Sequence, residues 1–409
     1  MLIKLAWRNL WRQKRRTLLT AFALALALIL SLLMRSIQEG SYTANIENAA
    51  RLSTGLIQLQ NPEFKESQNI DDLLPMSDEF IQPAKQQPNI EFTLPRIETF
   101  SLAAAKDKSK GVMVVGVAPQ EENAYSKLAD KVVKGEYFSE NDKSILLSEG
   151  LSQFFNVDVG DEVVLYGQGY RGQTAAGLYH IKGIVHFPMP ELNNQLVYLP
   201  IKEASMLFST ENQVTAWVLH TRDFSQLRQT VNDLQIGYGS TVSVRPWNDL
   251  SPEMEQQIQI DRVSGIVMMY ILYGIVGFAL FATLLMMTLE RQREFGVMLA
   301  TGMGRMRLLQ LLIFESLFIS LLGIAIGLII ASPVLGYLYF NPITLTGDTA
   351  IAMLEMGYEP IIPVLISSWL FINQIMTVIG LLFLCLLYPL WRIYHLNIVF
   401  ALKGGSHAT

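Results

Sequence analysis

Long apolar runs interrupt the chain at four places. They cover residues 17–34, about 266–289, 308–338 and about 361–391. Each run is about 18 residues or longer, and a helix of that length can cross the hydrocarbon core of a bilayer. The last run is long enough to include an interfacial turn before its span. The pattern predicts an α-helical membrane protein with four transmembrane helices and a large insertion between the first and the second.

Basic residues mark one side of the membrane. Arg392 and His395 follow the last run, and a larger basic cluster precedes the first: Lys4, Arg8, Arg12, Lys14, Arg15 and Arg16. Because cytoplasmic segments are enriched in Lys and Arg, we expect a bacterial inner-membrane protein with both termini cytoplasmic and the insertion periplasmic. Trp7 and Trp11 within the cluster indicate an interfacial helix. A cleaved signal peptide is the alternative, but no small-x-small cleavage site follows the run before Arg35.

The insertion has the pattern of an α+β domain. Short runs rich in Val, Ile and Tyr, bounded by Gly, Pro or Asp, predict strands. The expected strands are residues 56–60, 111–117, 144–147, 162–166, 178–186, 195–199, 215–220 and 241–245, and the expected helices are 149–155, 202–208 and 224–234. A domain of about 190 residues can bury an adequate core without disulfides.

Helical patterns also continue beyond the membrane on the periplasmic side. The Ser-Pro-Glu sequence at 251–253 supplies an N-cap, a first-turn proline and an acid at the positive helix end. The helix that follows would have about 39 residues and a length of roughly 58 Å, whereas the hydrocarbon core is only about 30 Å thick. A polar helical stretch at 36–51 follows the first run. We expect two stalks that transmit movement, with Gly40 or Gly265 as places for a bend.

A polar segment at 290–307 separates the second and third runs. Its arginines and glycines predict a short amphipathic helix at the cytoplasmic surface, on which a soluble partner can push. The residues expected to contribute to this coupling are Glu290, Arg291, Arg293, Glu294, Phe295, Gly296, Met298, Leu299, Gly302 and Arg305. Glu315, inside the third run, is costly in hydrocarbon, so we expect it to face protein or the interface as a packing anchor.

These patterns divide the chain into nine segments. They are a cytoplasmic interfacial helix (1–16), a first transmembrane helix (17–40), a periplasmic α+β domain with helical stalks (41–263), a second transmembrane helix (264–289), a coupling segment (290–307), a third transmembrane helix (308–340), a periplasmic loop (341–360), a fourth transmembrane helix (361–391) and a cytoplasmic tail (392–409).

Composition and motifs argue against catalysis and against nucleic-acid binding. The net charge is −5, and the basic residues gather near membrane ends. No Gly-x-x-x-x-Gly-Lys-Ser/Thr phosphate loop occurs. His180 and His186, with Glu191 nearby, make a metal site conceivable, but solvated or core histidines are the favoured interpretation. We expect no metal, no catalytic residue and no cofactor bound by this chain.

Two loops are candidates for contact with a periplasmic partner or cargo. Residues 167–177 are Gly-rich and lie between two expected strands, which is typical of a flexible hairpin loop. Tyr170 and Arg171 near its middle are residue types enriched in interfaces. Phe187 and Met189 lie beside prolines, and a strand-end turn is the favoured interpretation of this segment.

Three segments together resemble an FtsX/MacB-type ABC transporter permease, closest to the lipoprotein-releasing LolC/LolE group. They are the opening Ala-Trp-Arg-Asn-Leu-Trp-Arg-Gln-Lys-Arg-Arg-Thr-Leu-Leu-Thr at 6–20, the Glu-Arg-x-Arg-Glu-Phe-Gly-Val-Met-x-Ala-x-Gly-Met pattern at 290–303, and Tyr-Pro-Leu-Trp-Arg at 388–392 with Ala401 and Leu402 near the end. The resemblance covers nearly the whole chain. Residues 167–177 depart from it, since the lipoprotein-releasing LolC subunits carry a longer, proline-containing hook there that captures a carrier protein.

The resemblance implies a permease paired with a second permease, identical or homologous, and with two copies of a cytoplasmic ABC ATPase that binds ATP and Mg²⁺. Residues 290–307 would meet the ATPase, and membrane lipids would surround the spans. The expected function is extraction or export of a lipoprotein or another amphipathic substrate. The alternatives are a mechanotransducing signalling subunit that activates a periplasmic enzyme, and a membrane-anchored periplasmic enzyme.

Overall fold

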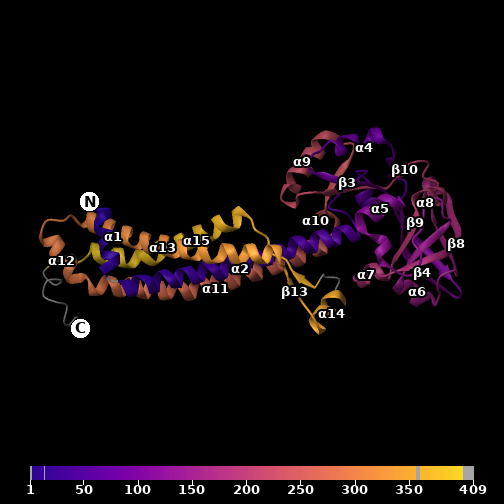
Figure 1. Ribbon diagram of the computed structural model, residues 1–409. Coiled ribbons are helices and arrows are strands. Elements are labelled where there is room, and N and C mark those ends of the chain that lie inside the picture. The colour runs from indigo at the N-terminus through magenta and orange to yellow at the C-terminus, as the bar shows by residue number, and fades with distance from the viewer. Residues whose placement is uncertain (1, 13, 356–359, 399–409) are drawn as a thin grey trace. The chain divides into compact units, whose positions relative to one another are not determined.

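Helices dominate one part of the chain and strands the other. The computed structural model describes residues 2–12, 14–355 and 360–398 (Figure 1). The chain divides into two compact units. We call Met1–Ser41, Gln257–Ile343 and Ile362–Thr409 the membrane unit, and Tyr42–Gln256 with Thr344–Ile361 the α+β unit.

Four helices are long and apolar enough to cross a membrane, which confirms the prediction from the apolar runs. They are α2 (Lys14–Leu52), α11 (Pro252–Glu290), α13 (Arg305–Phe340) and α15 (Ser368–Tyr394), each with an 18-residue window of mean hydropathy between 2.2 and 2.5. Two shorter helices, α1 (Leu2–Arg12) and α12 (Gln292–Ala300), complete the membrane unit.

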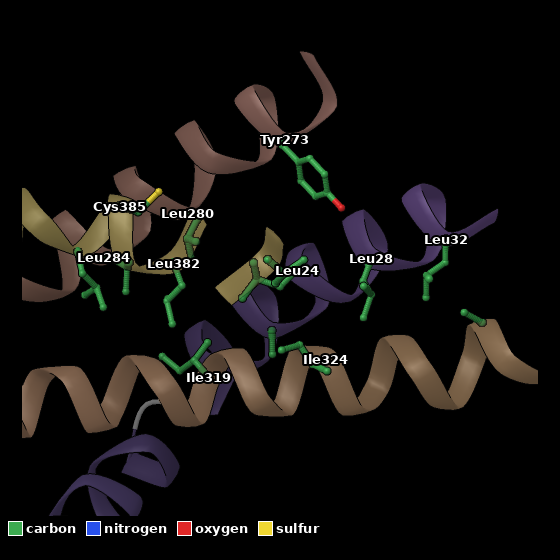
Figure 2. Packing of buried hydrophobic residues seen from close by; sticks show 14 of the residues in the cluster. Leu24, Leu28, Leu32, Tyr273, Leu280, Leu284, Ile319, Ile324, Leu382 and Cys385 are labelled. Carbon is green, nitrogen blue, oxygen red and sulfur yellow. The ribbon is translucent and has the colours of Figure 1, made fainter. Parts of the chain in front are cut away.

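The core of the membrane unit joins all four long helices. Leucines of α2 at positions 24, 28 and 32 face Leu280 and Leu284 of α11, Ile319 and Ile324 of α13, and Leu382 of α15 (Figure 2). Gly323 and Gly327 of α13 allow the close approach of α2, because a Cβ on Gly323 would lie 2.8 Å from the carbonyl oxygen of Ala21. Small residues four apart permit such contact between membrane helices.

The two predicted stalk helices are present. α2 and α11 each contain 39 residues and run on without a break through Gly40 and Gly265. Gly40 serves a close approach instead of a bend: a Cβ there would lie 2.6 Å from the carbonyl oxygen of Pro363. Each of the two helices therefore begins in one unit and ends in the other. The role of these helices in transmitting movement stays a prediction.

The fourth transmembrane helix starts later than the apolar run suggested. Helix α15 begins at Ser368, not near residue 361. The preceding residues are extended because the Leu365 N–H donates to the carbonyl oxygen of Ser36 at 2.9 Å, which holds this segment along α2. The connection from α13 contains β13 (Ile343–Thr344), α14 (Asp348–Glu355) and β14 (Ile361–Ile362).

The α+β unit is built on a 10-stranded sheet, part of which closes on itself. Strand β3 pairs with β4, β4 with β9, β9 with β6, β6 with β8, β8 with β7, and β7 returns to β3. A closed ring leaves no strand edge unpaired within it. The ring strands are β3 (Ile90–Ala105), β4 (Lys108–Val117), β6 (Ser144–Ser148), β7 (Glu162–Gln168), β8 (Thr174–Val185) and β9 (Leu196–Pro200).

The remaining strands and helices extend and cover this ring. Strands β11 (Ala216–Thr221), β1 (Ile57–Gln60) and β12 (Ser243–Pro246) continue from β3, and β5 (Val132–Gly135) pairs with β8, while β2 (Leu74–Pro75) and β10 (Gln213–Val214) pair separately. The helices are α3 (Phe64–Ser67), α4 (Asp78–Lys85), α5 (Pro119–Ser126), α6 (Glu149–Phe155), α7 (Pro190–Asn193), α8 (Ile201–Phe208), α9 (Leu227–Tyr238) and α10 (Trp247–Leu250).

The longest strand, β3, was not among the predicted strands. Its 16 residues include Pro95, which lacks the N–H that a central strand needs. The proline is tolerated because the pairing with β4 begins only at Arg96, so Pro95 has a neighbouring strand on one side only. The eight predicted strands all correspond to observed ones, whereas the expected loop at 167–177 consists largely of the arms of a β7–β8 hairpin.

Candidate coupling site

The segment between α11 and α13 forms the predicted amphipathic helix. Helix α12 presents Phe295, Gly296 and Leu299 to the interior and exposes Arg293 and Val297. The helix ends in a turn in which Gly302 has a φ of 95°, a left-handed conformation that glycine adopts readily. Helix α13 then starts at Arg305, with Gly304 as its N-cap.

The inner face of α12 belongs to an apolar cluster of the membrane unit. Phe295 is 2% exposed and lies in one cluster with Ala6 of α1, Leu312 of α13 and Ile393 of α15. Its ring also lies 5.1 Å from the guanidinium carbon of Arg291. Phe295, Gly296 and Leu299 therefore fasten α12 to the bundle, and their part in coupling stays a prediction. Met298 packs at the edge of the same cluster.

A buried ion pair lies beneath α12. Arg291 is 5% exposed and Glu315 is 2% exposed, and two guanidinium nitrogens of Arg291 bond the carboxylate, one of them at 3.2 Å. The Asn9 side-chain amide of α1 donates to the same carboxylate at 2.7 Å. Bidentate pairs of this kind fix geometry as well as charge. The expectation that Glu315 faces protein is confirmed, and its partners are Arg291 and Asn9.

The pair continues outward to the surface. Glu294 accepts from the Arg291 Nε at 3.1 Å and from Arg12 of α1, and Arg16 pairs with Glu290. Partial burial alone would raise the pKa of Glu294, but its hydrogen bonds with Arg291 and Arg12 hold that pKa below its usual value. Arg12, Glu294, Arg291 and Glu315 thus form one chain of contacts from the exposed α1 surface to a buried carboxylate, and the Arg16–Glu290 pair is separate from it.

Arg305 closes the site on the other side. Its guanidinium donates to the carbonyl oxygens of Tyr394 and, at 3.2 Å, of Leu396, at the C-terminal end of α15. A cation at this position stabilises the negative end of a helix. The predicted coupling residues therefore converge, with Glu290, Arg293 and Glu294 at the surface and Arg291 in the interior.

Asn9 was not among the predicted site residues. A signal for it exists in the sequence, since Ala6, Asn9 and Leu10 are spaced three and four apart and share one helix face. Ala6 and Leu10 are buried, so the face that carries Asn9 is the face that packs on α13.

A second buried ion pair holds the far end of α2 inside the α+β unit. Arg96 donates to Glu122 through Nε at 3.0 Å and through Nη2 at 2.8 Å, and both side chains are almost fully buried. Arg96 also donates to the carbonyl oxygen of Ser53, just after the last residue of α2. The Tyr125 hydroxyl donates to the carbonyl oxygen of Ala50 at 3.3 Å. These two donors add side-chain contacts at the C-terminal end of α2, where the Ala50 carbonyl also accepts from the Gly55 N–H at 2.7 Å.

Burial shifts the titration of neighbouring groups in this joint. Burial raises the pKa of Glu98, against the opposing effect of Arg96. Burial and the nearby charge of Arg51 lower the pKa of His220 to about 4. His220 is therefore neutral near pH 7, and its Nδ1 lies 3.3 Å from the Tyr125 hydroxyl.

The proposed contact loops differ in what they expose. Tyr170 and Arg171 lie at the tip of the β7–β8 hairpin, with the Arg171 guanidinium 4.9 Å from the Tyr170 ring centre and the Arg171 N–H bonded to Asp71. Phe187 is 1% exposed and stacks near Tyr198, which corrects the expectation that it contacts a partner. Met189 is half-buried.

The histidines considered as metal ligands have carboxylate neighbours instead. His186 lies 2.6 Å from Glu149, and His180 lies 3.8 Å from Glu162. Among the residues that the structure describes, no three His, Cys, Asp or Glu side chains gather in a way that could hold a metal ion.

Comparison with known proteins matches both parts of the chain. The model of a MacB-like periplasmic core domain matches residues 17–236, and that of an FtsX-like permease C-terminal domain matches 266–398. The lipoprotein-releasing system transmembrane protein LolC of Neisseria meningitidis is 21% identical over 58% of this chain and 59% of its own length. LolE of Haemophilus influenzae is 23% identical over 60% of this chain and 61% of its own.

The match therefore spans about three fifths of the length of these relatives. Among solved structures, the periplasmic region of MacB from Actinobacillus actinomycetemcomitans matches with a TM-score of 0.34 and 14% identity, over 49% of this chain and 92% of that chain. On the two domain models, which together match most of the sequence, the chain belongs to the family of ABC transporter permeases that join a MacB-like periplasmic core domain to an FtsX-like C-terminal domain.

Proposed function

We propose that this chain is a permease subunit that couples ATP hydrolysis by a separate cytoplasmic ATPase to movement of its α+β unit. In this proposal both termini and α12 are cytoplasmic, the α+β unit is periplasmic, and the substrate is a lipoprotein or another amphipathic molecule. Two ATPase copies and a second permease, identical or homologous, complete the complex.

The observation that carries the proposal is the bracing of α2 at both ends. Near its start, Arg16 pairs with Glu290 at the end of α11. At its other end, within the α+β unit, Arg96 donates to the carbonyl oxygen of Ser53, just beyond the helix, and Tyr125 donates to that of Ala50 in the last turn. A helix whose ends are both fixed transmits a displacement because neither end can slip against its neighbours.

The ion-paired segment around α12 is suited to receive the push. Arg293 and Val297 form an exposed face, while Phe295 and the Arg291–Glu315 pair fasten the helix to α1 and α13. A force on the exposed face would therefore move α1, α12 and α13 together. The names of the relatives, which refer to lipoprotein release, favour a lipidated substrate for this chain as well.

Site-directed photocross-linking tests the ATPase contact. A photoreactive amino acid at Val297, which is 47% exposed on α12, is expected to capture an ABC ATPase from cells that express the full chain. The matched control is Phe278, which is 74% exposed in the middle of the α11 span and should capture no ATPase. Absence of ATPase at Val297, or equal capture at both positions, would contradict the proposal.

The substrate is tested with the complex purified together with its ATPase and reconstituted in vesicles. A lipoprotein or a hydrophobic compound is expected to stimulate ATP hydrolysis. No response to any cargo, together with tight binding of a periplasmic hydrolase, would instead identify a signalling subunit.

A further inference from the structure

An open cavity of about 820 Å³ lies between α1 and the turn from α12 to α13. Its lining combines three basic residues, Lys4, Arg8 and Arg307, with apolar side chains that include Ile3, Met303 and Phe314. All of them belong to the membrane unit. The volume falls within the range of roughly 300–1,000 Å³ typical of small-molecule sites.

The three basic residues of this cavity have no acidic partner among the described residues, unlike three arginines close to them. Arg12, Arg16 and Arg291 pair with carboxylates. Lys4 and Arg8 lie four residues apart on α1, so one helix face carries two like charges. Such a spacing is destabilising unless an anion lies nearby.

The backbone adds to the positive character of the cavity. Helix α13 contains 36 residues and starts at Arg305, with Gly304 as an N-cap that has no side chain to accept a hydrogen bond. Gly302 and Gly304 have open space around the positions that a Cβ would occupy. A helix N-terminus attracts anions through its free N–H groups and its dipole.

The apolar wall suggests how the rest of the ligand is held. Ile3 is 55% exposed, and Trp7 and Trp11 on the same helix are about half exposed. The Trp7 ring packs edge-on against Phe318 of α13, with 5.5 Å between centroids. Half-exposed tryptophans are typical of the boundary between headgroups and acyl chains, which favours a position of α1 at the level of the phospholipid phosphates.

We propose that this cavity binds the headgroup of an anionic phospholipid. The phosphate lies among Lys4, Arg8 and Arg307, and the upper part of the acyl chains lies against Ile3, Met303 and Phe314. A bound lipid links α1 to the turn before α13, so it fastens the coupling site from outside as the Arg291–Glu315 pair does from inside. The proposal does not depend on which substrate the complex moves.

Photolabelling of the unmodified full chain in detergent tests the site. A phosphatidylglycerol with a photoactivatable acyl chain is expected to label peptides within residues 2–12 and 301–314 at least fivefold more than the matching phosphatidylcholine. Equal labelling by both lipids would show an apolar groove without headgroup recognition. Loss of phosphatidylglycerol labelling on addition of inorganic phosphate at the same concentration would show a site for a free anion. Either result overturns the proposal.

A pair of double variants gives the second measurement. Arg8→Gln with Arg307→Gln is expected to reduce the labelling by roughly tenfold or more, because each basic residue near an anionic surface contributes substantially to binding. The control, Lys14→Gln with Arg15→Gln, removes two exposed charges outside the cavity and should change labelling by less than about twofold. Arg8→Lys with Arg307→Lys should retain it. An equal loss of labelling in the control would show that general surface charge attracts the lipid, and it would overturn the proposed site.

Discussion

Two buried arginine–glutamate pairs occupy the two units of this protein, and they are built differently. Arg96 and Glu122 in the α+β unit are each 2% exposed, and the further contacts of Arg96 are the nearby Glu98 and the carbonyl of Ser53. Arg291 and Glu315 in the membrane unit are equally bidentate, but Arg291 also contacts Glu294, whose side chain is 44% exposed.

The difference indicates that the Arg96–Glu122 pair is a rigid connection, whereas the contacts of the Arg291–Glu315 pair can change. The side chains paired with Arg96, Glu122 and Glu98, are at most 17% exposed, so this pair is largely shielded from solvent and its geometry depends on the fold. The Arg291 pair reaches the surface through Glu294 and Arg12, where a bound protein can compete for the same charges. The function that we propose uses both pairs, because a force would enter near the pair that a partner can alter and leave near the pair that stays fixed.

Breaking the Arg96–Glu122 pair should have the largest effect on stability. Arg96→Met leaves Glu122 buried without its partner, and losing one member of a buried pair costs about 3–5 kcal/mol. We expect faster amide hydrogen exchange in β3, in α5 and at the end of α2 of the full chain. The double variant Arg96→Met with Glu122→Leu removes both charges and should be more stable than Arg96→Met alone. If the single variant is as stable as the native chain, the pair does not form a joint.

The next largest effect should be the dependence of stability on pH through His220. Burial lowers the pKa of His220 from 6.5 to about 4. Between these two pH values the unfolded state therefore binds a proton at His220 and the folded state does not. The free energy of unfolding therefore has its full value above about pH 6.5 and falls by up to about 3 kcal/mol as the pH approaches 4. Denaturant unfolding at pH 7.5 and pH 4.5 measures the loss.

The His220→Gln variant should lose part of this acid sensitivity, since it removes the titrating group. His186→Gln is the matched control because His186 is exposed, and it should keep the native pH dependence. Identical pH profiles for all three proteins would exclude His220 as the source.

Breaking the Arg291–Glu315 pair should cost less stability. Arg291→Met leaves Glu315 buried, but Asn9 still donates to its carboxylate, so we expect a loss of about 2–3 kcal/mol. Because Asn9 ties α1 to this pair, α1 should become more accessible to protease in the variant. Arg293→Met, on the exposed side of α12, should change stability by less than about 0.5 kcal/mol. Equal effects of the two variants would contradict the internal role of Arg291.

Removing the surface contact should have the smallest effect on stability. The Arg12–Glu294 pair is about half exposed, and such pairs contribute roughly 0–1 kcal/mol. Arg12→Ala should therefore leave thermal unfolding within a few degrees of the native value and weaken ATPase coupling instead. A large loss of stability would show that this pair is structural and that the site does not adjust.

Part of this architecture was predictable from the sequence. The four spans follow from apolar runs, and the long α11 follows from its N-terminal Ser-Pro-Glu sequence and the absence of a strong breaker. The hairpin tip at Tyr170 lies between two predicted strands, although the sequence predicts a loop where the structure has the Gly-rich ends of those strands. Strand β3 was missed because Pro95 and the mixed polar pattern around Arg96 hide a strand that changes neighbours halfway along its length.

Sequence alone determined the number of membrane helices, the presence of an α+β insertion and the position of α12, because these depend on local composition and periodicity. Only the tertiary structure decided which charges meet. Asn9 and Glu315 are 306 positions apart, and Arg96 finds its partner on a helix after the next strand. Such contacts arise from how helices and strands pack, and a carboxylate in an apolar run shows that a partner must exist without showing which one.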